Sequence, residues 1–232
     1  MLAVAAAVSL WACGHQTQPA EEAEASNRAP ATPSELAPTT QSQAPSGDSR
    51  PVIAAFGDSL SAGFGLDPGQ SFPDDLQRDL DAAGYKYRVV NLGVSGDTTT
   101  DGAERLPSVL AVRPAIVILE FGGNDGLRGL PVAAAKANLE KIIQAIQSSG
   151  AKVVLAGMTL PRNYGPEYIH AFEQMYVALA DQYKLARIPF LLEGVGGNPN
   201  LMQPDGIHPT AQGAEIVANT VMRYLAPLLR KS

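Results

Sequence analysis

Short strand-like segments alternate with helical segments along residues 51–232, and this order restricts the fold more than any other feature of the chain. Runs rich in apolar and β-branched residues indicate strands, which we expect at 52–56, 87–92, 115–119, 152–157 and 188–192. Apolar residues at helical spacing predict helices at 72–83, 99–110, 132–149, 166–183 and 211–228. Strands that alternate with helices form a parallel sheet covered by helices on both faces. The sequence therefore predicts an α/β fold.

The composition agrees with one globular domain and argues against a nucleic-acid partner. Hydrophobic residues make up 45% of the chain and charged residues 17%, so the chain can bury a core. The formal net charge is -6 at pH 7, and no block rich in Lys and Arg is available to neutralise phosphates. We therefore expect no nucleic acid as a partner, and we expect a monomer.

Cysteine and histidine are scarce, which restricts the chemistry. Cys13 is the single cysteine of the sequence, so neither an intramolecular disulfide nor a cysteine-based zinc site can form. The three histidines are His15, His170 and His208, too few and too scattered for a histidine-rich metal cluster. We expect no metal and no organic cofactor, and few side chains remain as candidates for a general base.

The amino-terminal residues have the pattern of an export signal. Residues 1–12 are almost wholly apolar, too short to span a bilayer as a helix, and typical of the hydrophobic part of a secretory signal. The tetrapeptide that ends at Cys13 resembles the lipobox of bacterial lipoproteins, in which the cysteine becomes the lipidated first residue. The resemblance implies an exported bacterial protein, periplasmic or held at a membrane through Cys13. The alternatives are an ordinary cleaved signal and a cytosolic tail.

Residues 14–50 are rich in Pro, Ser, Thr, Ala, Gln and Glu and contain few large aliphatic residues. Such a segment cannot bury enough apolar surface to offset the entropy lost on ordering, so we expect a disordered tether. The chain is thus predicted to consist of a signal-like segment at 1–13, a tether at 14–50 and a folded domain at 51–232.

Two loops that follow predicted strands carry candidates for nucleophilic chemistry. Ligands of parallel sheets bind beyond the carboxyl ends of the strands. Ser59 follows the first strand at the start of a turn toward a helix, where free N–H groups favour an oxyanion. The alternative is a turn that only caps the helix. Gly96 follows the second strand and can direct its N–H into the same site; the alternative is an ordinary turn capped by Asp97 or Thr98.

Two further loops supply an amide and an acid–imidazole pair. Asn124 follows the third strand, and its side-chain amide is a neutral donor suited to a developing oxyanion. The alternative is a glycine-rich turn in which Asn124 has a left-handed conformation. Asp205 lies three residues before His208 and can fix the tautomer of that imidazole, whereas His170 lies inside a predicted helix. The alternative is a structural histidine. Together the four loops supply the groups that a serine hydrolase needs.

These residues resemble the SGNH (GDSL) hydrolase superfamily. The matching stretches are GDSLSAG at 57–63, GDTT at 96–99, GGNDGLRG at 122–129 and DGIHP at 205–209. The resemblance implies a three-layer, flavodoxin-like α/β/α sandwich with a five-stranded parallel sheet. It also implies a triad of Ser59, Asp205 and His208, and an oxyanion hole formed by Ser59, Gly96 and Asn124. An α/β-hydrolase is disfavoured because its Gly-x-Ser-x-Gly motif is absent around Ser59.

Within the superfamily, the sequence is most similar to the bacterial branch of arylesterase, acyl-CoA thioesterase I and lysophospholipase. The stretch LPRNYG at 160–165 and the following Tyr168 extend this similarity, and we expect Tyr164 and Tyr168 to bind substrate. The branch implies hydrolysis of carboxylic esters, acyl thioesters or lysophospholipids through an acyl-enzyme. Two alternatives stay open: a carbohydrate or cell-wall O-acetylesterase, and a surface lipoprotein that uses the fold only for binding.

Overall fold

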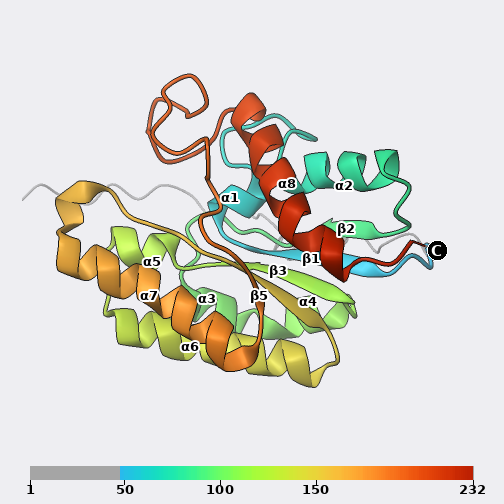
Figure 1. The fold of residues 1–232 in the computed structure, drawn as a ribbon, viewed down its shortest axis with the longest axis horizontal. Helices are drawn as coiled ribbons and strands as arrows, with labels where there is room; N and C mark the ends of the chain where they lie inside the picture. The colour runs from blue at the N-terminus through green and yellow to red at the C-terminus, as the bar shows by residue number, and fades with distance from the viewer. Residues whose placement is uncertain (1–47, 232) are drawn as a thin grey trace, which may run out of the picture. The chain divides into compact units, whose positions relative to one another are not determined.

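The computed structural model describes residues 48–231, which lie within one compact unit. Its centre is a sheet of five parallel strands in the order β2-β1-β3-β4-β5 (Figure 1). The strands are β1 (Val52–Gly57), β2 (Arg88–Asn91), β3 (Ile116–Glu120), β4 (Lys152–Ala156) and β5 (Ala186–Ile188). This is the flavodoxin-like strand order, so the predicted fold class is confirmed. The order reverses at β1, whose carboxyl end is therefore a topological switch point.

Helices cover both faces of the sheet and complete three layers (Figure 1). On one face lie α1 (Ser59–Ala62), α2 (Phe72–Ala82) and α8 (Ala211–Leu225). On the other face lie α3 (Thr99–Glu104), α4 (Leu106–Ala111), α5 (Gly123–Leu127), α6 (Val132–Ser148) and α7 (Pro166–Tyr183). Two 3₁₀ turns complete the set, η1 (Arg162–Tyr164) and η2 (Ala226–Leu228).

The burial of the central strands explains why they lack the alternating pattern of a one-sided sheet. Every residue of β1 and of β3 is buried, because helices pack on both faces of these strands. The strands pair in register, with Ala54 opposite Val117 and Gly57 opposite Glu120. The last pair brings the carboxyl ends of β1 and β3 together, so the loops after these two strands begin side by side.

Three predicted elements differ from the structure by more than one residue at a boundary, and a proline lies at each of these places. The helix expected at 99–110 is divided at Arg105 into α3 and α4, because Pro107 has no N–H for a continuous helix. The strand expected at 188–192 is instead β5 at 186–188, since Pro189 cannot donate to the ladder. The last helix ends at Leu225, and the turn η2, which contains Pro227, follows it.

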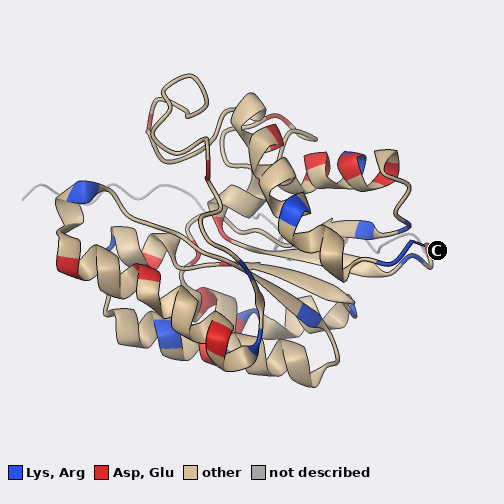
Figure 2. Ribbon diagram, in the orientation of Figure 1, with Lys and Arg blue, Asp and Glu red and all other residues tan. Residues whose placement is uncertain are grey.

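Charged residues of both signs lie mainly on the outer helices and in the loops (Figure 2). The segments expected at 1–13 and 14–50, with Cys13, lie outside the described residues except for 48–50. Of the helices between residues 48 and 231, none is both long enough and apolar enough to cross a bilayer.

Candidate active site

Ser59 is the first residue of α1, and one residue separates it from the end of β1. Asp58 is the N-cap of this short helix, and its Oδ1 accepts a hydrogen bond of 3.1 Å from the Leu60 N–H. The predicted capping turn is therefore present, but Asp58 provides the cap and the Ser59 side chain is free for another partner. Gly57 is needed just before it, because a Cβ at this position would overlap the carboxyl group of Glu120 and the hydroxyl of Ser61.

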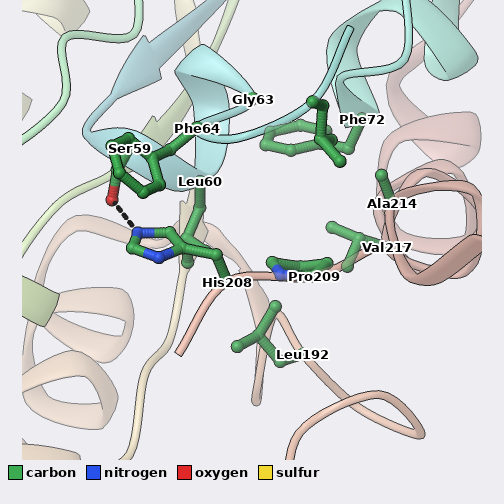
Figure 3. A pocket seen from close by; sticks show the side chains of 11 residues that line it. Ser59, Leu60, Gly63, Phe64, Phe72, Leu192, His208, Pro209, Ala214 and Val217 are labelled. Atoms are coloured by element: carbon green, nitrogen blue, oxygen red, sulfur yellow. Dashed lines mark hydrogen bonds between the residues drawn. The ribbon is translucent and has the colours of Figure 1, made fainter. Parts of the chain in front are cut away.

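The loop before α8 brings an imidazole to this serine. The Nε2 atom of His208 lies 2.8 Å from Ser59 Oγ, although the two residues are 149 positions apart (Figure 3). Asp205 Oδ2 lies 2.7 Å from His208 Nδ1, and Asp205 Oδ1 accepts from the N–H groups of Ile207 and His208 at 2.9 and 3.0 Å. A carboxylate at Nδ1 places the proton there, so Nε2 is the acceptor for the serine proton.

Asp205 is charged over the whole neutral range. Burial by itself would raise its pKa, but the hydrogen bonds from the N–H and ring of His208 and from the Ile207 N–H outweigh it and lower the pKa to about 2. Its side chain keeps 37% of its surface exposed, so water screens part of its interaction with the imidazole. The carboxylate is thus available to orient His208 at any pH where the protein is expected to work.

Phe64 packs against the other side of this arrangement. Its ring lies 4.6 Å from the His208 ring, centroid to centroid, at 41° (Figure 3). Both residues also line a small apolar pocket of about 10 Å³, room for roughly one water molecule, with Phe72, Leu192 and Val217 (Figure 3). Sequence reasoning missed Phe64, because nothing in the pattern shows which exposed aromatic residue will meet the imidazole.

Two backbone N–H groups are free to bind an oxyanion. Among residues 48–231, neither Ser59 N nor Gly96 N donates a hydrogen bond to a protein acceptor. Gly96 has φ +88, a left-handed conformation that favours glycine. Its carbonyl accepts a bond of 2.8 Å from Arg128 Nη2, which holds this peptide in place. The predicted alternative is also present: Thr98 caps α3 in a capping box.

Asn124 lies in the first turn of α5, and its amide faces the first two loops. The left-handed alternative was wrong for Asn124: Gly122, the N-cap, has that conformation with φ 116. Asn124 Nδ2 donates to Asp58 Oδ2 at 3.1 Å and to the Asp97 carbonyl at 2.9 Å. Both partners are acceptors, which fixes the orientation of the amide. An oxyanion would therefore have to share or replace one of these two bonds.

A buried pair of carboxyl groups lies beside the nucleophile. Glu120, the last residue of β3, is fully buried, and its Oε2 accepts from Asp58 N at 3.1 Å, Ser61 N at 3.3 Å and Ser61 Oγ at 2.8 Å. Burial, and then the neighbouring Asp58, raise the pKa of Glu120 well above its ordinary value. Burial also raises the pKa of Asp58 to about 6, opposed by the hydrogen bond from Leu60. Sequence reasoning missed Glu120, although a charged residue at the end of an otherwise apolar strand was a visible signal.

A pocket of about 810 Å³ opens beside Ser59 and His208. Much of its wall is apolar and comes from the loops after β1, β3, β4 and β5, with Leu60, Leu127, Met158, Leu160 and Leu192 among the lining residues. Ser59, Gly96, Asn124 and His208 line the same pocket. The three residues expected to form the oxyanion hole therefore line the same pocket as His208.

Tyr164 and Tyr168 do not line this pocket. Their hydroxyls donate to the carbonyls of Leu127 and Leu130 at 2.8 and 2.7 Å, and so join η1 to the end of α5 and α7 to the loop that follows α5. Direct substrate binding by these tyrosines stays a prediction. Within the described part of the chain, no cluster of three or more His, Cys, Asp or Glu side chains is placed to hold a metal ion.

Comparison with known proteins settles the family. The profile of the GDSL-like lipase/acylhydrolase family matches residues 55–216. This chain belongs to that family. Esterase TesA of Pseudomonas aeruginosa is 50% identical over 179 residues, which cover 77% of this chain and 89% of the esterase. Thioesterase 1/protease 1/lysophospholipase L1 of Escherichia coli is 38% identical over 179 residues, with coverage of 77% and 85%.

A solved structure gives the same result for the fold. The crystal structure of TesA matches with a TM-score of 0.75 at 49% sequence identity, and the match covers 77% of this chain and 99% of the solved chain. The predicted resemblance to the GDSL hydrolases, and to the thioesterase and lysophospholipase branch, is confirmed. The chain is an enzyme of this hydrolase family.

Proposed function

We propose that the enzyme is a serine esterase that hydrolyses carboxylic esters and acyl thioesters, lysophospholipids among them, through an acyl-enzyme on Ser59. The observation that carries this proposal is the 2.8 Å contact between Ser59 Oγ and His208 Nε2 at the edge of an apolar pocket. The names of the two relatives, an esterase and a thioesterase/lysophospholipase, support the same reaction class. We assign His208 as the base and Asp205 as the group that orients it.

The first half of the reaction forms the acyl-enzyme. Ser59 Oγ attacks the carbonyl carbon of the substrate while its proton passes to His208 Nε2. The carbonyl oxygen becomes an oxyanion, which the N–H groups of Ser59 and Gly96 and the amide of Asn124 stabilise. When the tetrahedral intermediate collapses, the bond to the leaving alcohol or thiol breaks. His208 gives its proton to that leaving group.

The second half repeats the cycle with water. A water molecule gives a proton to His208 Nε2 and attacks the acyl carbon, and the same three donors hold the second oxyanion. The bond to Ser59 Oγ then breaks, the proton returns to that oxygen, and the carboxylic acid leaves. The carboxylate of Asp205 stabilises the imidazolium in both halves, because its lowered pKa keeps it charged throughout.

The pocket supports an acyl chain as the recognised part of the substrate. Five of its lining residues, Leu60, Leu127, Met158, Leu160 and Leu192, are apolar side chains that a hydrocarbon can contact. Each CH₂ group transferred from water into such a wall contributes about 0.8 kcal/mol. We therefore expect kcat/KM to rise from acetyl to octanoyl esters. Strict preference for acetyl would instead favour the carbohydrate or cell-wall O-acetylesterase.

Two measurements on the purified full chain test the proposal. A fluorophosphonate probe should label the wild type at Ser59, and Ser59→Ala should lose both labelling and p-nitrophenyl ester hydrolysis by about 10⁴-fold or more. Ser108→Ala is the matched control, because Ser108 lies on α4 and bonds only the Arg105 carbonyl. Substantial hydrolysis by Ser59→Ala would refute the nucleophile. A folded wild type that resists the probe would favour a binding protein.

We further propose that the enzyme is exported and held at a membrane by a lipid on Cys13, on the strength of the lipobox-like sequence that ends there. A fatty-acid probe should label the wild-type protein in bacterial cells and should fail to label Cys13→Ala. Equal labelling of both proteins would refute the anchor, and a cleaved but unlabelled protein would favour an ordinary secretory signal.

A further inference from the structure

The carboxyl group of Glu120 holds together the turn that presents Ser59. One of its oxygens, Oε2, accepts three hydrogen bonds from residues on either side of the nucleophile, namely Asp58 N, Ser61 N and Ser61 Oγ. The register of the sheet places Glu120 directly opposite Gly57. The end of β3 therefore holds both ends of the segment 58–61, although no hydrogen bond joins Glu120 to Ser59 itself.

The other oxygen, Oε1, is the informative atom. It is buried, and no group among the described residues donates a hydrogen bond to it. A buried acceptor without a partner is costly. The side chain of Asp58 lies near enough to Glu120 for the two carboxyl groups to share a hydrogen bond when one of them carries a proton. A proton on Oε1 would give this unpaired atom a partner and leave the pair with a single negative charge.

We propose that Glu120 is a positioning residue that acts as a neutral carboxylic acid: it holds the Ser59 turn through one oxygen and donates its proton to the Asp58 carboxylate through the other. This inference rests on the proposed function of Ser59 and adds a requirement for it. The side chain of residue 120 must therefore both accept and donate hydrogen bonds. The side chain of residue 58 must only accept them.

Asp58 is the partner that holds the charge, because its neighbours are donors. Its two oxygens receive the Leu60 N–H and one hydrogen of the Asn124 amide. The acidic proton of Glu120 adds a third donor. Glu120, by contrast, has no further donor for its second oxygen and is completely buried. Burial raises the pKa values of both groups, as expected for two neighbouring carboxyls that share one negative charge.

Other charged and titratable side chains surround the pair on several elements. They are His208 in the loop before α8, Tyr176 on α7, Arg105 between α3 and α4, and Asp125 on α5. Since His208 acts on the Asp58 carboxyl and both carboxyls act on Tyr176, a pH profile alone would not isolate Glu120. Amide variants isolate the role of each carboxyl group. They have the same shape as the acid but cannot ionise, so they fix the hydrogen-bond donors and acceptors at one position.

The two amide variants have opposite expected outcomes. In Glu120→Gln, the amide oxygen replaces Oε2 and the NH₂ group replaces the acidic proton, so every hydrogen bond is kept. In Asp58→Asn, the side chain has one acceptor oxygen, and its NH₂ group must face a donor in either orientation. We expect kcat of Glu120→Gln to stay within threefold of the wild type, and kcat of Asp58→Asn to fall about 10²-fold through misplacement of the nucleophile.

The experiment measures kcat and KM for p-nitrophenyl butyrate at pH 8, together with thermal melting, on the purified full chain. Asp75→Asn is the matched control, because Asp75 is a buried carboxyl on α2 that lines neither pocket. Its kcat should equal that of the wild type. KM of the three variants should stay within about threefold, since the change affects positioning of the attacking oxygen rather than the apolar wall.

A loss in Glu120→Gln as large as that in Asp58→Asn would overturn the inference, because it would show that Glu120 acts as a carboxylate. Wild-type kcat in Asp58→Asn would overturn it as well, since the charge would then not be needed at residue 58. Ser59→Ala, assayed in parallel, tests the proposed function separately. If that variant stays active, the nucleophile assignment fails whatever the two amide variants show.

Discussion

Replacing Asp205 with asparagine should damage the enzyme more than removing the side chain altogether. The reason lies in two backbone donors: Asp205 Oδ1 accepts from the N–H groups of Ile207 and His208 at 2.9 and 3.0 Å. An asparagine must place its single oxygen there to satisfy them. Its NH₂ group is then directed at His208 Nδ1, where the carboxylate oxygen lies at 2.7 Å in the wild type.

That NH₂ group is a donor, so Nδ1 has to be the acceptor and the proton of the imidazole moves to Nε2. In this tautomer Nε2 cannot take the proton of Ser59. We expect kcat of Asp205→Asn to fall by about 10³–10⁴, which corresponds to roughly 4–5 kcal/mol in activation free energy. In Asp205→Ala the tautomer is unconstrained, and because the wild-type side chain is 37% exposed, water can reach Nδ1. We expect that variant to retain about tenfold more activity than the asparagine variant.

Steady-state hydrolysis of a p-nitrophenyl ester by the two variants checks this order, with thermal melting as the control for folding. The asparagine keeps the two backbone hydrogen bonds, so it should melt close to the wild type, whereas the alanine leaves both donors to water. Equal activities, or an asparagine variant more active than the alanine variant, would refute the assignment of Asp205 as the residue that selects the tautomer.

Three further outcomes are expected. Asn124→Ala should lower kcat about 10²–10³-fold with little change in KM, because the role proposed for its amide is to stabilise the developing oxyanion; a change confined to KM would contradict this. Gly122→Ala should cost about 2–4 kcal/mol in urea unfolding, since φ is +116 and its Cβ would overlap the Tyr176 hydroxyl. Gly129→Ala, at φ +64 in open space, is its control and should cost about 1 kcal/mol. The raised pKa of Glu120 means that the folded state binds more protons than the unfolded state above the ordinary pKa, so stability falls with rising pH. Glu120→Gln lacks this proton uptake, and its melting temperature minus that of the wild type should be more positive at pH 8.5 than at pH 6.5.

The sequence alone determined the order of the elements and the loops that carry the chemistry. These features depend on interactions between residues near one another along the chain: the period of apolar side chains, the glycines that end strands, and the spacing of Asp205 and His208. The same local character explains the errors. Apolar spacing over a window predicted one helix at 99–110, while the single residue Pro107 decided that there are two.

Contacts between distant segments were decided by the tertiary structure. Ser59 and His208 meet across 149 positions because β1 and the loop before α8 share one edge of the sheet, and no local pattern encodes that distance. The same holds for Phe64 against the imidazole, and for the tyrosines whose hydroxyls bind backbone carbonyls away from the pocket wall. Glu120 is the clearest case. The sequence shows that a glutamate is present, but its proposed protonation follows from complete burial beside a second carboxyl group. That burial exists only in the folded protein, where the sheet and both helical layers surround the residue.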